Sequence, residues 1–163
     1  MEHRFWNSRD IALTGVFAAL YAVGVLALAP ISFILVQVRV ADALLTLTML
    51  FGYPAIIGVT IGCLIANFFG GLGIVDLTLG PLANLSACLL GYYVGRHSRL
   101  GGSLVITALV TLIVGGYLAL LFGFPVYVGW GFVGLGSVTS IIVIGLPLTY
   151  ALEKHFRRVS IRR

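Results

Sequence analysis

Charged residues are almost absent from the middle of this 163-residue chain. Between Asp10 and Glu153 only five formally charged side chains occur: Arg39, Asp42, Asp76, Arg96 and Arg99. Of the whole chain, 60% of residues are hydrophobic and 9% are charged, and the mean hydropathy is +1.12. Because a charged side chain inside a bilayer is costly, this pattern predicts an all-α polytopic membrane protein whose isolated inner charges are candidate functional residues.

Apolar runs separated by glycine, proline or charge predict a bundle of six transmembrane helices in one integral membrane domain, residues 1–163. The runs are 11–28, 40–51, 55–69, 77–94, 104–122 and 132–152. The second run has twelve residues. At about 1.5 Å per residue it falls short of a roughly 30 Å hydrocarbon core. We therefore expect that its helix begins earlier or that neighbouring helices shelter it.

Basic residues predict the orientation of these helices. In a six-span arrangement every lysine and arginine except Arg39 falls on one side of the membrane. By the positive-inside rule, both termini are expected in the cytoplasm. The first run is expected to be a retained helix and not a signal peptide, because it is longer than a signal core and Pro30 follows it.

Several function classes are disfavoured by residues that the chain lacks. Lys154 is the sole lysine and lies in the C-terminal tail, so no phosphate-binding loop exists and any ATP hydrolysis must come from a partner. His3, His97 and His155 are expected in cytoplasmic segments, away from the intramembrane serines. We therefore expect no enzyme, no metal site and no cofactor. The net charge of +5 is concentrated in the tails and one loop, which favours anionic headgroups over nucleic acid.

Polar residues are expected to converge on the outer face of the membrane. They lie at the start of the second helix, the end of the third and the start of the fourth: Gln37, Arg39, Asp42, Asn67 and Asp76. Two structural interpretations stay open. Arg39 and Asp42, three residues apart, suit an ion pair with Arg39 extending to the headgroups, and Asp76 suits a helix N-cap after the glycine-rich turn.

The fourth helix carries a stripe of small and polar residues at helical spacing: Asp76, Gly80, Ala83, Asn84 and Ala87. By helix rise, Asn84 lies about 12 Å inward of Asp76. The stripe leaves room for a ligand. It is equally typical of close helix packing in which Asn84 makes an interhelical hydrogen bond.

An aromatic-rich outer loop is expected between the last two helices, within residues 123–131. Tyr127 and Trp130 in it suit either a membrane-interface belt or a lid that stacks on a flat heterocycle. A purine-like base needs such stacking faces beside carboxylates and amides, which accept and donate hydrogen bonds at the ring edge.

Small residues also line one face of the first helix: Gly15, Ala18, Ala19 and Ala22. Such a face admits another helix closely, either from a partner or from this chain.

Four motifs give the chain a resemblance to a known family over nearly its whole length. They are Ala-Pro-Ile-Ser-Phe at 29–33, Val-Gln-Val-Arg-Val-Ala-Asp-Ala-Leu at 36–44, Gly-Cys-Leu-Ile-Ala-Asn at 62–67 and Gly-Gly-Leu-Gly-Ile-Val-Asp at 70–76. With these motifs the chain resembles the QueT family of substrate-binding S components of energy-coupling factor (ECF) importers.

The resemblance implies high-affinity uptake of a queuosine precursor of the deazaguanine type across a prokaryotic cell membrane. It implies assembly with a transmembrane T component and two ATPase subunits, docking through the Ala18/Ala22 face, and toppling of the loaded S component. The residues expected to bind substrate are Gln37, Arg39, Asp42, Asn67, Asp76, Asn84, Tyr127 and Trp130. The alternatives are an S component for another small heterocycle, a small self-assembling channel or exporter, and an accessory membrane protein.

Overall fold

The structure is a computed structural model that describes the backbone of residues 6–28 and 39–161, with side chains as far as residue 156. All regular elements in these ranges are helices, which confirms the all-α prediction for this part of the chain. The elements are α1 (Ser8–Ala27), the 3₁₀ helix η1 (Val40–Asp42), α3 (Ala43–Phe51), α4 (Tyr53–Gly70), α5 (Ile74–Gly95), α6 (Arg99–Phe122), α7 (Val126–Ser137), the π-helix η2 (Val138–Gly145) and α8 (Leu146–Ile161).

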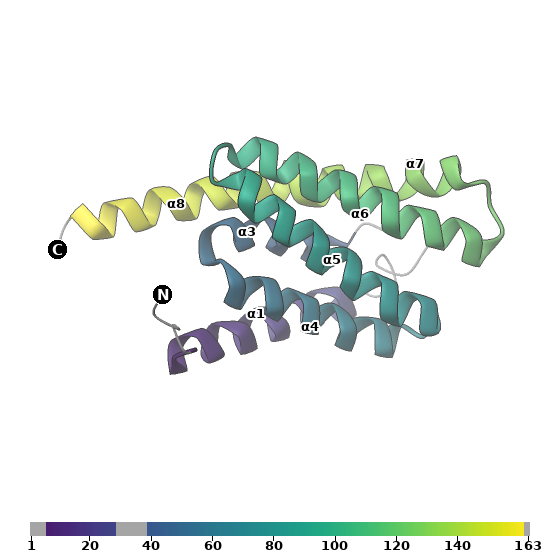
Figure 1. Ribbon diagram of the computed structural model, residues 1–163, viewed down its shortest axis with the longest axis horizontal. Coiled ribbons are helices and arrows are strands. Elements are labelled where there is room, and N and C mark those ends of the chain that lie inside the picture. Colours follow the sequence, from purple (N-terminus) through teal and green to yellow (C-terminus); the bar gives the residue numbers. More distant parts are fainter. Residues whose placement is uncertain (1–5, 29–38, 162–163) are drawn as a thin grey trace.

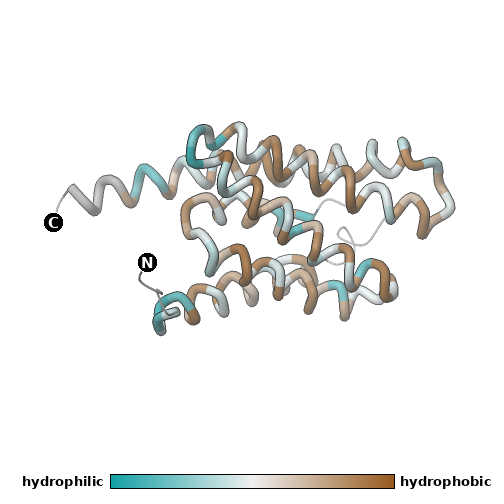
Figure 2. The backbone as a smooth tube through the Cα atoms, in the orientation of Figure 1, coloured by the Kyte–Doolittle hydropathy of each residue, from teal (hydrophilic) through white to brown (hydrophobic). Residues whose placement is uncertain are grey.

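The helices run along the long axis of an elongated bundle (Figure 1). Helix α1 packs on α4, α5 packs on both α4 and α6, and α7 packs on α6. The short α3 contacts α4, α5, α6, η2 and α8. We call the end with the start of α1 and the α3–α4 and α5–α6 turns the basal end, and the end with the α4–α5 and α6–α7 turns the apical end. Hydrophilic residues mark the start of α1 and the α5–α6 turn, both at the basal end (Figure 2).

Five helices are long and apolar enough to cross a membrane, namely 8–27, 53–70, 74–95, 99–122 and 126–156. The second predicted run forms a shorter apolar helix, Val40–Phe51. Most of α3 is buried, including Leu45 and Thr46, which have no exposed surface. Neighbouring helices therefore shelter this short segment, which was one of the two expectations for a run too short to span the membrane.

Local signals explain where two of the helices begin. The Asn7 side chain accepts a hydrogen bond from the Asp10 backbone N–H at 2.9 Å, and the Asp10 carboxylate accepts one from the Asn7 N–H at 3.4 Å. This capping box fixes the start of α1. Gly52 alone separates α3 from α4, with a φ of +68° that residues with a Cβ rarely adopt.

Arg99 joins four helices at the basal end. It forms an ion pair with Glu153 of α8 at 3.3 Å, and it donates hydrogen bonds to the Met49 carbonyl at 3.1 Å and the Gly95 carbonyl at 3.0 Å. The carbonyls belong to the last turns of α3 and α5, whose final C=O groups lack helical partners. One side chain thus ties the ends of α3 and α5 and the middle of α8 to the start of α6.

The predicted aromatic loop is wrong in its extent. Helix α7 begins at Val126 and continues through η2 into α8, so Tyr127 and Trp130 are helical and the loop shrinks to 123–125. The prediction was wrong because the glycines of this segment were interpreted as turn residues. A Cβ on Gly129 would collide with the backbone of Gly115 in α6, so glycine there permits close contact between two helices and does not form a turn.

Candidate functional site

A buried cluster of polar side chains lies at the apical end of the bundle. We call it the apical polar cluster. It collects residues from α1, the start of η1, and α4, α5 and α6: Tyr21, Arg39, Asp42, Asn67, Asp76, Asn84 and Tyr117. All seven are less than 9% exposed. Gln37, also predicted for this site, lies outside the described residues.

Asp76 is the centre of one half of the cluster. Its Oδ1 accepts a hydrogen bond from the Tyr117 hydroxyl of α6 at 2.6 Å and lies 3.8 Å from Nη2 of Arg39. The Asn67 amide of α4 donates to the Asp76 backbone carbonyl at 2.9 Å. A nearby cation and a short hydroxyl bond offset the cost of burying this carboxylate.

Asp42 is the centre of the other half. Its Oδ1 accepts a hydrogen bond from the Tyr21 hydroxyl at 2.6 Å, and Tyr21 in turn accepts one from the Asn84 amide at 3.0 Å. This chain of bonds connects α1, the start of α3 and α5. The interhelical bond of Asn84 agrees with the packing interpretation of the α5 stripe, whose five residues are all buried.

Two acceptor atoms of the cluster have no hydrogen-bond partner among the described residues. They are Oδ1 of Asn67 and Oδ2 of Asp76, and both atoms are buried. A buried acceptor that stays unpaired costs about 1–3 kcal/mol, and more when it is charged. Folded proteins pair nearly all such atoms, so each of these two acceptors has a lone pair to which no described residue donates.

Close helix packing brings the Asn67 side chain against α5. A Cβ added to Gly80 of α5 would collide with Nδ2 of Asn67, so glycine at this position allows the Asn67 side chain to lie against α5. The Asn67–Asp76 hydrogen bond then fixes the end of α4 against the start of α5. Helices therefore position both Asn67 and Asp76.

Two structural interpretations of these residues were wrong. Gly73 is the N-cap of α5, and Asp76 is the third helical residue, with its carboxylate bonded to Tyr117. Arg39 is 5% exposed and forms an ion pair with Asp76, so it does not extend to the headgroups. The 3₁₀ turn of η1 begins after Arg39, which leaves this residue in extended backbone.

Tyr127 and Trp130 lie on α7, beside α6. The Trp130 indole donates a hydrogen bond to the Leu112 carbonyl at 3.2 Å, and Tyr127 is 72% exposed. The hydrogen bond holds Trp130 against α6, and no described hydrogen bond connects either residue with the apical polar cluster.

The small-residue face of α1 is divided between two environments. Ala18 and Ala22 are 8% and 7% exposed, and a Cβ on Gly62 of α4 would lie 2.6 Å from the Ala18 carbonyl oxygen. These two alanines therefore pack inside the chain. Gly15 and Ala19 are exposed, and a Cβ added to Gly15 would meet no atom within 4 Å.

Sequence reasoning missed the two tyrosines of the cluster. Tyr21 and Tyr117 each stand in an apolar run, where an aromatic ring is typical of core. Their position in the apical third of α1 and α6 was the available signal, because it places both hydroxyls at the depth of Asp42 and Asp76.

A cavity of about 560 Å³ lies at the basal end, around the α3–α4 turn. It shares no residue with the apical polar cluster, whose side chains mostly contact one another. The cluster and the cavity are therefore separate features.

Comparison with known proteins places the chain in a family. The family model described as QueT transporter matches residues 11–154, which cover most of the chain and all described members of the apical polar cluster. No curated protein matches the chain, and no solved structure does.

Proposed function

The chain belongs to the QueT transporter family, a family of membrane transporters and not of enzymes, and from this premise we propose that it is the substrate-binding S component of an ECF importer. The substrate in this proposal is a queuosine precursor with a deazaguanine base. A transmembrane T component and two ATPase subunits complete the importer. The sequence supports the assignment of ATP hydrolysis to separate subunits, because this chain has no phosphate-binding loop of its own.

The observation that carries the proposal is the pair of open acceptors in the apical polar cluster. Asp76 Oδ2 and Asn67 Oδ1 are buried without described partners on two adjoining helices. A deazaguanine presents a ring N–H and an exocyclic amine along one edge, so two neighbouring acceptors suit it. Arg39, 3.8 Å from Asp76, holds the positive charge that offsets the carboxylate before a ligand arrives.

The remaining expected site residues complete this proposal. Asp42 and Asn84 belong to the second half of the cluster and position it through Tyr21. Tyr127 and Trp130 cover a planar ligand in the proposal, from α7 and not from a loop. Polar character fades inward of Asn84, where the buried face of α5 continues with Ala87 and Cys88. That supports a pocket closed toward the basal end rather than a channel.

Six spans with both termini in the cytoplasm are part of the proposal. Helix α1 begins and α8 ends at the basal end (Figure 1), which also holds the basic residues of the α5–α6 turn and of α8. By the positive-inside rule, the basal end faces the cytoplasm and the apical polar cluster faces outward.

Binding of a deazaguanine base to the purified protein tests the substrate. Isothermal titration in detergent is expected to give one site per chain for a deazaguanine, and no binding for adenine, whose edge lacks the ring N–H next to the amine. Equal binding of both bases, or of neither, contradicts the substrate assignment.

Copurification tests the importer assignment separately. The tagged chain, expressed from its native host, is expected to bring down one T component and two ATPase subunits. If the chain binds a deazaguanine but brings down none of these partners, the substrate assignment stands and the ECF assignment is wrong.

A further inference from the structure

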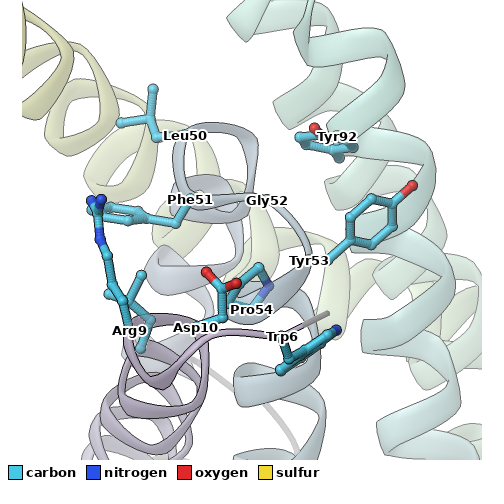
Figure 3. A pocket seen from close by; sticks show the side chains of 10 residues that line it. Trp6, Arg9, Asp10, Leu50, Phe51, Gly52, Tyr53, Pro54 and Tyr92 are labelled. Carbon is cyan, nitrogen blue, oxygen red and sulfur yellow. The ribbon is translucent and has the colours of Figure 1, made fainter. Parts of the chain in front are cut away.

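The cavity at the basal end combines charges of both signs with aromatic rings. It lies between the start of α1, the α3–α4 turn and the end of α5, and its lining includes Trp6, Arg9, Asp10, Phe51, Tyr53 and Tyr92. Figure 3 shows Arg9 on one side, Tyr53 and Tyr92 on the other, and the Asp10 carboxylate between them. The proposed transport function uses none of these residues.

This cavity lies at one end of the apolar helices, which is where polar headgroups meet a membrane protein. Helices α1, α4 and α5 are all apolar enough to span a membrane, and the cavity is at the ends of all three. Trp6 and Tyr53 are each 46% exposed there, as is typical of residues at a membrane interface. Ile11 and Val16, further along α1, are exposed and apolar, so they continue the surface toward the hydrocarbon core.

We propose that the basal cavity binds the headgroup of a zwitterionic aminophospholipid, with the phosphate at Arg9 and the ammonium at Asp10. A guanidinium forms strong charge-assisted hydrogen bonds with phosphate oxygens. A carboxylate beside an aromatic face suits a primary ammonium, which donates hydrogen bonds and is attracted to the ring face of Trp6. The acyl chains then lie against the exposed apolar side of α1.

The charge balance of the cavity distinguishes this ligand from an anionic lipid. Arg9 and Asp10 are neighbours in the chain and contribute one charge of each sign. A headgroup with a phosphate alone leaves the Asp10 carboxylate facing a negative charge, whereas phosphoethanolamine matches both residues. An aromatic belt by itself requires no such pair of opposite charges.

Arg96, a second basic residue near the cavity, already contacts Tyr92. Arg96 donates a hydrogen bond to the Tyr92 hydroxyl at 2.8 Å, and its guanidinium lies 4.8 Å from the centre of the Tyr92 ring. This contact holds Tyr92 at the edge of the cavity. Among the residues that the structure describes, Arg9 is the cation that lines the cavity.

Lipid selectivity of the purified full chain is the test. Detergent micelles are doped with phosphatidylethanolamine, phosphatidylcholine or phosphatidylglycerol of identical acyl chains, and thermal unfolding and native mass spectrometry report binding. Phosphatidylethanolamine is expected to raise the midpoint of unfolding most and to be retained preferentially. Asp10→Asn and Arg9→Gln are each expected to weaken its apparent affinity about tenfold, since each removes one charge-assisted contact.

The control variant is Lys154→Gln, which removes an exposed basic side chain of α8 that does not line the cavity. It is expected to bind phosphatidylethanolamine like the unaltered chain. Equal stabilisation by all three lipids, or a preference for phosphatidylglycerol, overturns the proposal. So does free phosphoethanolamine that binds as tightly as the whole lipid, because the acyl chains would then contribute nothing. If the Arg9 and Asp10 variants do not fold, the selectivity of the unaltered chain decides alone.

Discussion

At the scale of single residues, the apical polar cluster shows how two carboxylates persist in a membrane protein. Asp42 and Asp76 each accept a tyrosine hydroxyl bond of 2.6 Å, and Arg39 adds a positive charge 3.8 Å from Asp76. Without these partners each charge would cost several kcal/mol at that depth. The same partners leave one Asp76 oxygen open, so stabilisation and proposed recognition use different atoms of one side chain.

Asp76→Asn is expected to weaken binding of a deazaguanine roughly 10- to 100-fold, the value of a charge-assisted hydrogen bond. The amide keeps an acceptor for the Tyr117 hydroxyl but turns donors toward the ligand. Asp42→Asn is expected to weaken binding less, because Asp76 Oδ2 is a buried oxygen without a described partner, whereas neither oxygen of Asp42 is in that state. Isothermal titration measures both, with Glu153→Gln as a carboxylate-to-amide control at the basal end. Unchanged affinity in both aspartate variants contradicts their role in recognition.

Experiments on Trp130 distinguish a lid over the ligand from a membrane-interface belt. Trp6 and Trp130 are the chain's two tryptophans, so Trp6→Phe leaves Trp130 as the sole indole fluorophore. If Trp130 covers the ligand, a deazaguanine is expected to quench its fluorescence, and Trp130→Ala is expected to weaken binding about tenfold or more through lost stacking. Unquenched fluorescence together with unaltered affinity identifies Trp130 as part of a belt held by its bond to Leu112.

At the scale of helices, glycine sets how closely neighbours approach. Gly58 and Gly62 of α4 contact α1, Gly80 of α5 contacts Asn67, and Gly129 of α7 contacts α6. In a bilayer the lipid tails are as apolar as leucine, so association of helices depends on close packing more than on hydrophobic burial. These glycines therefore contribute to stability through the contacts that they permit.

Gly129→Ala is expected to destabilise the chain by about 1–3 kcal/mol, because its methyl group would collide with the Gly115 backbone. The matched control on the same helix is Gly131→Ala, since a Cβ there meets no atom within 4 Å. That change is expected to be neutral or to stabilise α7 by about 0.5–1 kcal/mol. Thermal unfolding in one detergent compares the two. Equal midpoints would show that the α6–α7 contact does not limit stability.

The two small-residue pairs of α1 are expected to behave differently. Gly15→Leu with Ala19→Leu adds bulk to an exposed surface, so copurification of the T component should fail while deazaguanine binding survives. Ala18→Leu with Ala22→Leu adds bulk against α4 and is expected to lower the unfolding midpoint and ligand affinity together. Normal copurification of the Gly15/Ala19 variant rules out docking through that stripe.

At the scale of the whole molecule, the two ends of the bundle differ in chemistry. The apical end contains the buried polar cluster, while the basal end contains the Arg99 clamp, the basal cavity and the basic segments. The proposed orientation, with the apical polar cluster outside and the basal end in the cytoplasm, rests on this asymmetry.

Impermeant thiol labelling tests this orientation. In a background with Cys63→Ala and Cys88→Ala, we expect Tyr127→Cys at the apical end to react in intact cells. His97→Cys at the basal end is expected to react only after the membrane is disrupted. Both positions are exposed in the folded chain. The reverse pattern would contradict the proposed outward orientation of the apical polar cluster.

The sequence by itself determined the class of protein and the polar residues of the site. Scarce charges in long apolar runs indicated membrane helices, because a helix satisfies its backbone hydrogen bonds within one segment and without water. Arg39, Asp42, Asn67 and Asp76 stood out because any polar group there is costly. Periodicity also placed the α5 stripe on one face, which the structure finds buried.

Only the tertiary structure decided which of these residues pair. Arg39 pairs with Asp76, far along the chain. Tyr21 and Tyr117 join the cluster from helices whose sequences are typical of plain apolar core. Helix packing likewise assigned Ala18 and Ala22 to the interior and turned an expected glycine loop into α7. Spacing along the chain reports which face a residue occupies, whereas contact between faces depends on how closely whole helices approach.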